Sequence, residues 1–163
     1  MKLKITFMLA AWMFWAASTR TAHAAPPTDA CSLLTQAQVT AVLGVPVGAG
    51  EKIAPNTSAL CGWEVSGEKS FQRKRVVLNI YTQMGSASPT QRFNYAKMPI
   101  KGITKVPVTG IGDDAIFAVT PGFGTGLLFR KGDAAFDLRV YGFPNDQAEA
   151  REKQLAQDIL ARL

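Results

Sequence analysis

GLLFRKGDAAFDLRVY, residues 126–141, is the stretch of this chain that most clearly indicates its type of fold. Two apolar runs, 126–130 and 134–141, flank the turn tripeptide KGD, which predicts two antiparallel strands joined by a tight hairpin. In the second run apolar side chains occupy every other position (F-x-L-x-V). That alternation predicts one buried and one solvated face, which is typical of an antiparallel sheet.

Further strands are expected on both sides of this hairpin, because short runs rich in β-branched and aromatic residues recur between turn residues. They cover residues 60–65, 75–81, 104–108 and 115–120, with a weaker strand over 45–54. Pro107 lacks an N–H group, so the strand at 104–108 is expected at a sheet edge.

Three helices are expected between the strands. Thr35 and Gln38 form a capping-box pattern that starts the first helix, and Gly44 ends it. Ser88, followed by Pro89, starts the second. A stripe of apolar residues at helical spacing predicts the third over residues 146–163. With hairpin-length connections, this order predicts the α+β class: an antiparallel sheet of about six to seven strands flanked by two or three helices.

The N-terminal segment has the layout of a secretory signal peptide. Lys2 and Lys4 precede an apolar run over residues 5–18, and an A-x-A cleavage pattern ends at Ala24. A membrane anchor needs about 20 apolar residues, more than this run offers, and no cysteine stands at the cleavage site for lipidation. We therefore expect a signal peptide at 1–24, a flexible lead-in at 25–30 and a single α+β domain at 31–163. The mature protein is expected in the periplasm or outside the cell, with no stable membrane insertion.

Cleavage changes the composition that matters for function. It removes three of the 18 basic residues, leaving 15 against 12 acidic ones, and it removes His23, the only histidine. This mild positive charge in an exported chain does not favour nucleic acid as a partner.

Two cysteines, Cys31 and Cys61, remain in the mature chain. Oxidising compartments favour pairing, and closing a loop of about 30 residues stabilises a fold by roughly 3–4 kcal/mol in the chain-entropy model. A reactive thiol or a metal pair is the alternative. Without histidine, two sulfurs supply a zinc site poorly, so we expect a disulfide, no metal site and no cofactor.

Several short motifs occur in a characteristic order: CSLLT at 31–35, CGW at 61–63, GIGDDA at 110–115, GDAAFDL at 132–138 and a closing helix. In this the chain resembles a family of small exported bacterial proteins of unknown function, many of them lipoproteins of actinobacteria. The resemblance covers most of residues 31–163. It implies a PsbP/Mog1-like fold and pairing of the two cysteines, but it brings no activity and no catalytic residues. The chain departs from most members in having no lipobox.

The residues offer little for catalysis. A Ser-His-Asp or Cys-His arrangement needs a base beside the nucleophile, and no mature histidine exists to serve. Ser66 and Lys69 have the spacing of a Ser–Lys dyad, but they fall in a turn. Asp113 and Asp114 suit calcium or acid–base chemistry less well than a turn, given the glycines around them. The glycine-rich stretch 122–126 precedes a strand rather than a helix, so a hairpin loop is favoured over a phosphate loop. We predict no catalytic residues and no enzyme.

Two groups of residues are candidates for binding. The segment KSFQRKR at 69–75 can hold an acidic partner, an anionic polysaccharide or lipid headgroups, although a solvated hairpin explains it too. A cleft between sheet and helices can be lined by Tyr81, Tyr95, Tyr141 and Phe143, although core packing explains these aromatic residues equally well. The candidate binding residues are Lys69, Phe71, Arg73, Lys74, Arg75, Phe123 and Tyr141.

Together these observations favour a non-enzymatic binding module that recognises a protein or a component of the cell envelope. One alternative is an inhibitor or immunity-type protein that blocks an exported enzyme through the loops near Asp113 or Phe123. A further alternative is a small-ligand or lipid-binding protein, or an unrecognised hydrolase, that uses the cleft.

Overall fold

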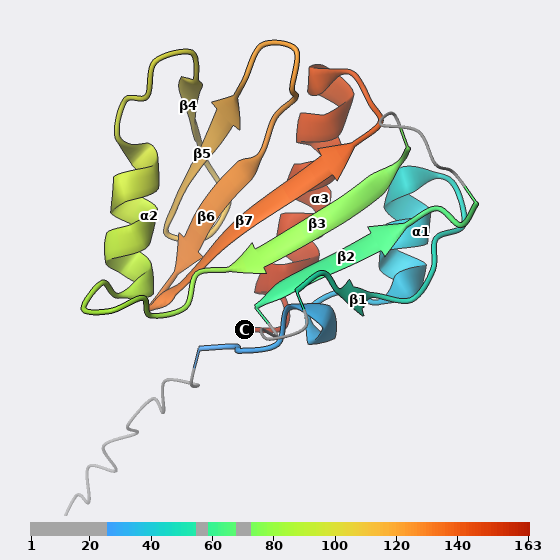
Figure 1. Ribbon diagram of the computed structural model, residues 1–163, viewed down its shortest axis with the longest axis horizontal. Helices are drawn as coiled ribbons and strands as arrows, with labels where there is room; N and C mark the ends of the chain where they lie inside the picture. The colour runs from blue at the N-terminus through green and yellow to red at the C-terminus, as the bar shows by residue number, and fades with distance from the viewer. Residues whose placement is uncertain (1–25, 55–58, 68–72) are drawn as a thin grey trace, which may run out of the picture.

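The computed structural model describes residues 26–54, 59–67 and 73–163. The expected signal peptide and the candidates Lys69 and Phe71 lie outside these residues. Within them a seven-stranded antiparallel sheet runs in the order β1-β2-β3-β7-β6-β5-β4. Helices α1 and α3 cover one face of the sheet, and α2 stands against the other face at one side (Figure 1). The predicted α+β class is confirmed, with seven strands and three α-helices.

The strands begin and end close to their predicted positions. They are β1 Glu51–Lys52, β2 Leu60–Glu64, β3 Arg75–Ile80, β4 Thr104–Val108, β5 Asp114–Val119, β6 Leu127–Lys131 and β7 Ala134–Tyr141. β4 lies at an edge, as Pro107 predicted.

The prediction of a strand over residues 45–54 was too long, because only Glu51 and Lys52 pair with β2. Gly50 just before them lies against a core side chain: a Cβ atom there would lie 2.6 Å from Trp63 Nε1. Trp63 itself is buried. Close packing on this indole therefore sets the path of the chain before β1, and glycine suits that close approach.

The predicted capping box at the start of the first helix is present, and the predicted start of the second helix carries a capping box as well. Thr35 and Gln38 cap α1 (Gln36–Leu43), and Ser88 and Gln91 cap α2 (Pro89–Lys97). The third helix, α3 (Asn145–Leu160), ends three residues before the predicted Leu163, whose residue surface is 38% exposed. The last carbonyl groups of a helix have no partner within it, so its final turn loosens where nothing covers it.

Two apolar clusters fill the faces of the sheet. Alternate residues of β7, Phe136 and Leu138 among them, are buried with α1 and α3, which confirms the alternation seen in the sequence. On the other face Phe93 of α2 packs with Leu128 and Ala135. This second cluster is small, so α2 covers only part of its face of the sheet.

Gly112 is expected to tolerate no side chain. Its φ is +58°, and a Cβ atom would lie 2.2 Å from the carbonyl oxygen of Arg130. We expect Gly112→Ala to lower the free energy of unfolding by at least about 2 kcal/mol, since it adds a backbone clash to an unfavourable φ. Gly110→Ala is the matched control: its φ is +79° but its Cβ atom meets nothing within 4 Å. That control should lose about 1 kcal/mol. Urea denaturation measures both losses. If the two variants lose the same free energy of unfolding, the backbone around Gly112 shifts to relieve the clash and the prediction is wrong.

Candidate functional site

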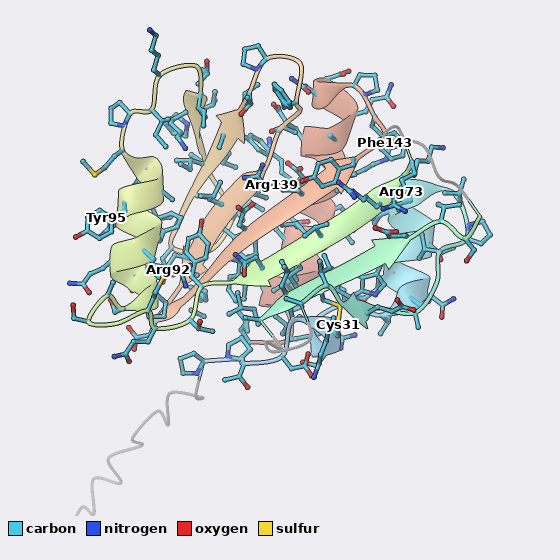
Figure 2. The ribbon with its side chains drawn as sticks, viewed as in Figure 1. Cys31, Arg73, Arg92, Tyr95, Arg139 and Phe143 are labelled. Atoms are coloured by element: carbon cyan, nitrogen blue, oxygen red, sulfur yellow. A yellow bond between two sulfur atoms is a disulfide. The ribbon has the colours of Figure 1, made fainter. Side chains whose placement is uncertain are left out.

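The part of the sheet that α2 leaves uncovered carries the polar residues of β3 and β7. Arg75 stands opposite Tyr141, and Val77 opposite Arg139, and these residues are half-buried while their neighbours along the strands are buried. We call this surface the open face, and it is turned toward the viewer in Figure 2. Its residues are Glu64, Arg73, Arg75, Tyr81, Arg92, Lys105, Asp137, Arg139 and Tyr141.

Arg139 lies in the middle of the open face (Figure 2). Its Nε donates to Asp137 Oδ1 at 3.0 Å and its Nη2 to Asp137 Oδ2 at 3.1 Å. Burial alone would lower the pKa of the Arg139 guanidinium, but the hydrogen bond and charge of Asp137 raise it above its ordinary value. The stem of Arg139 lies close to Gly126, where a Cβ atom would come within 3.1 Å of Arg139 Cγ. The guanidinium is therefore held between Asp137 of its own strand and Gly126, which directly precedes β6.

Arg92 reaches the open face from α2. Its guanidinium lies 4.8 Å over the ring of Tyr81, and its Nη1 donates to the carbonyl oxygen of Thr82 at 2.7 Å. Burial, and then the charge of Asp137, raise the pKa of Tyr81 to about 12, so its hydroxyl stays protonated. Tyr81 is thus a neutral hydrogen-bonding group beside a fixed cation.

Lys105 adds a cation from the edge strand β4. Burial, followed by the positive charge of Arg139, lowers the pKa of Lys105 from its ordinary value. Lys105 and Arg139 therefore lie close enough to repel each other on the open face. The open face holds five cationic side chains against the carboxylates of Glu64 and Asp137, so it attracts anions.

A hollow of about 520 Å³ adjoins the open face where β7 ends. We call it the aromatic pocket, and its aromatic walls are Phe123, Tyr141 and Phe143, with Gly122, Gly124, Gly142, Pro144 and Asn145 also lining it. The guanidinium of Arg75 lies 4.4 Å over the ring of Tyr141. Because Tyr141 belongs to both surfaces, the aromatic pocket and the open face are continuous.

The described residues of the basic segment, 73–75, lie partly on the open face and partly at the aromatic pocket. Arg73 forms an ion pair with Glu64 at 2.9 Å. Lys74 lies 5.1 Å over the ring of Phe143, and Arg75 lies over Tyr141. The other two candidates, Phe123 and Tyr141, meet at the aromatic pocket. The structure thus brings Lys74, Arg75, Phe123 and Tyr141 close together.

The sequence reasoning missed three cations of the open face, Arg92, Lys105 and Arg139, and its two carboxylates, Glu64 and Asp137. Arg139 had a signal, since it alternates with the apolar residues of β7 and so belongs on the wet face. Arg92 and Lys105 come from separate elements, with no motif to join them. Of the other aromatic residues considered for a cleft, Tyr95 is 64% exposed and points away from the sheet (Figure 2).

The acidic pair Asp113–Asp114 does not form a joint site. The Asp113 carboxylate accepts from the N–H of Gly132 at 2.8 Å, whereas Asp114 pairs with Lys97. In the part of the chain that the structure describes, no cluster of three or more His, Cys, Asp or Glu is arranged to hold a metal ion. No helix in the same ranges has the length and apolar character needed to cross a membrane.

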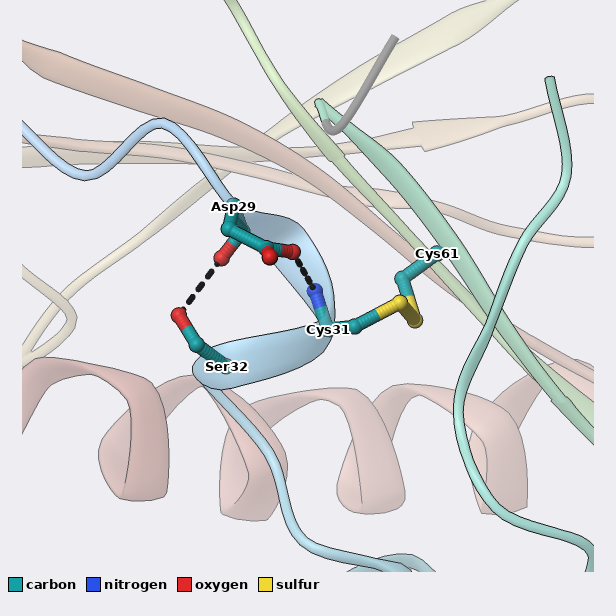
Figure 3. The surroundings of a disulfide bond; sticks show 4 residues. All are labelled: Asp29, Cys31, Ser32 and Cys61. Atoms are coloured by element: carbon teal, nitrogen blue, oxygen red, sulfur yellow. Dashed lines mark hydrogen bonds between the residues drawn. A yellow bond between two sulfur atoms is a disulfide. The ribbon is translucent and has the colours of Figure 1, made fainter. Parts of the chain in front are cut away.

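The predicted disulfide joins Cys31 to Cys61 and ties the short 3₁₀ helix Ala30–Ser32 to β2 (Figure 3). Asp29 caps this turn, since its Oδ1 accepts from the N–H of Cys31 at 2.9 Å. Disulfides persist in oxidising compartments and are rare in the cytosol, so the bond points to an extracytoplasmic location.

Fold and site together define an α+β protein with a disulfide and a basic, partly aromatic face on its sheet. No family model, no curated protein and no solved structure matches this chain. The resemblance to a family of exported bacterial proteins therefore stays a prediction. The open face is the feature of the molecule that bears on function.

Proposed function

We propose that this protein is an exported, non-enzymatic binding module that recognises an anionic component of the cell envelope, in the periplasm or outside the cell. The observation that carries the proposal is the open face, where five cations face two carboxylates on a part of the sheet that no helix of the described residues covers. The disulfide and the predicted signal peptide support the exported location.

The cations are suited to binding because they are held in place before a ligand arrives. Arg139 is fixed by Asp137, Arg92 by the carbonyl of Thr82, and Arg75 stacks on Tyr141. Guanidinium groups offer several N–H donors in a planar fork that matches carboxylate, sulfate and phosphate oxygens. Fixed side chains lose less conformational entropy on binding, which favours affinity.

The proposal predicts salt-sensitive binding of the mature protein to a polyanion, with dextran sulfate as the probe. The double variant Arg75→Gln/Arg139→Gln should bind about tenfold more weakly, a loss of about 1.4 kcal/mol. High salt should weaken wild-type binding by screening these exposed charges. A biosensor titration at low and high salt measures both effects.

Lys153→Gln is the matched control, because it removes one positive charge from the exposed side of α3, across the sheet from the open face. It should bind dextran sulfate like wild type, and circular dichroism should show that all variants fold. An equal loss in this control would mean that net charge alone drives binding. That outcome would remove the open face as the site.

A further inference from the structure

We infer that the aromatic pocket binds a sugar ring of an acidic polysaccharide, while the open face binds the carboxylate groups of the same chain. This inference rests on the proposed function and names its ligand class. Three features of the structure support it: the exposed ring of Phe123, the cations around the other two aromatic walls and the contact between the two surfaces at Tyr141.

Phe123 is the most exposed large apolar side chain of the described residues, at 83%. It lies between Gly122 and Gly124, which have φ values of +76° and +104°. Glycine adopts such angles readily, so the loop can turn sharply and present the ring to solvent. An aromatic ring carries negative charge density on its faces, and the C–H groups of a sugar ring pack against such a face.

The other two aromatic walls are backed by cations. Lys74 and Arg151 lie 5.1 Å and 3.9 Å from the ring centre of Phe143. Arg75 lies over Tyr141 in the same way. A neutral sugar can use these three cations only as hydrogen-bond donors to its hydroxyl groups, whereas an acidic sugar also places a carboxylate charge beside them. The combination of ring faces and cations therefore selects a sugar acid.

The pocket also offers hydrogen bonds for hydroxyl groups. Gly122 and Gly142 bring backbone groups to its lining, and Asn145, which carries a side-chain amide, also lines it. Amides and backbone groups both donate and accept, as sugar hydroxyls require.

A polymer can continue from the pocket along β7. Tyr141 and Arg139 are two residues apart on the same face of the strand, a separation of about 7 Å. A sugar ring bound at Tyr141 thus places the next sugars of the polysaccharide over Arg139 and Asp137. Arg92 and Lys105 lie farther along the open face. Repeated carboxylates on successive sugars would meet repeated cations.

Other anionic partners fit this geometry less well. A lipid surface is bound by a broad apolar face, whereas Phe123 is a single exposed ring beside a half-open hollow of about 520 Å³ that Asn145 and three glycines also line. An acidic peptide would use the cations but has no rigid ring to fill the space between Phe123 and Tyr141.

The test measures binding of four probes to the mature protein: oligogalacturonate, a neutral malto-oligosaccharide of the same length, polyglutamate and phosphatidylglycerol vesicles. We expect oligogalacturonate to bind most tightly and the neutral oligosaccharide to bind at least about tenfold more weakly. Phe123→Ser should weaken oligogalacturonate binding about tenfold at both low and high salt, because it removes stacking and no charge. Phe123→Trp should restore it.

Tyr95→Ser is the matched control: it also replaces an exposed aromatic ring by serine, but on the outer side of α2 (Figure 2). It should leave binding unchanged. If oligogalacturonate binds with loss in Arg75→Gln/Arg139→Gln but none in Phe123→Ser, the sugar site is wrong and the proposed function stands. Tighter binding of polyglutamate or vesicles, insensitive to Phe123, overturns the sugar site in favour of a protein or lipid partner. If no anionic probe binds, both proposals fail.

Discussion

Replacing Glu152 by glutamine is expected to stabilise the protein by several kcal/mol at pH 8, with the gain vanishing below pH 4.5. Glu152 is fully buried on α3, and its Oε1 accepts from the N–H of Val140 at 2.9 Å. Its Oε2 has no hydrogen-bond partner among the described residues. Burial raises the pKa of Glu152 to about 8, the Val140 hydrogen bond opposes this, and Asp137 adds to it. The folded protein therefore keeps this carboxyl protonated at neutral pH.

The sign of the effect follows from the proton balance. An unfolded chain releases the Glu152 proton near pH 4.5, whereas the folded chain releases it only near pH 8. Between these values the unfolded state binds fewer protons, so the free energy of unfolding falls by about 1.4 kcal/mol per pH unit. Above pH 8 this contribution levels off. Glu152→Gln is neutral in both states and removes the slope.

Urea denaturation at a series of pH values measures this difference. Asp158→Asn serves as the control, because it also removes a carboxylate from α3, one that is half-buried and six positions from Glu152. The difference in unfolding free energy between this control and the wild-type protein should change little across the same series of pH values. A stability gain in Glu152→Gln that is independent of pH would contradict a buried, protonated carboxyl in the wild-type protein.

Removing the disulfide is expected to cost about 3–4 kcal/mol of unfolding free energy, since Cys31 and Cys61 are 30 residues apart. The double variant Cys31→Ala/Cys61→Ala should show this loss in denaturant melts. Wild-type protein treated with a thiol reductant should fall to a similar stability, because reduction opens the same loop.

The double alanine variant is its own control, because a reductant should not change its stability. If wild-type protein shows two titratable thiols after reduction and yet unfolds at the same denaturant concentration as before, the disulfide does not stabilise the fold. Binding to dextran sulfate should persist in the double variant under native conditions, since neither cysteine belongs to the open face.

The parts of the fold that the sequence predicts well depend on local signals. The hairpin at residues 131–133 and the helix starts at Thr35 and Ser88 each involve residues within a few positions of one another. The predicted length of the first strand was wrong because Gly50 packs against Trp63 of the neighbouring strand. Long-range packing of this kind leaves no local pattern.

The candidate site was harder to predict, because its residues come together only through strand order. β3 pairs with β7 across more than fifty residues of chain, and that pairing places Arg75 beside Tyr141. The buried Glu152 had a partial signal: it follows Ala148 by four positions and precedes Leu155 by three, on the apolar stripe of α3. Because charged side chains are mostly exposed, the carboxylate of Glu152 favoured a surface position for this residue.

The two edges of the sheet bear on how the protein behaves at high concentration. β1 pairs over only two residues, and β4 carries Pro107, which has no N–H to offer a neighbouring chain. Fibril growth requires a long row of open backbone groups as a template. Neither border of this sheet supplies one, so crowded molecules should stay dispersed and not recruit each other into ordered aggregates.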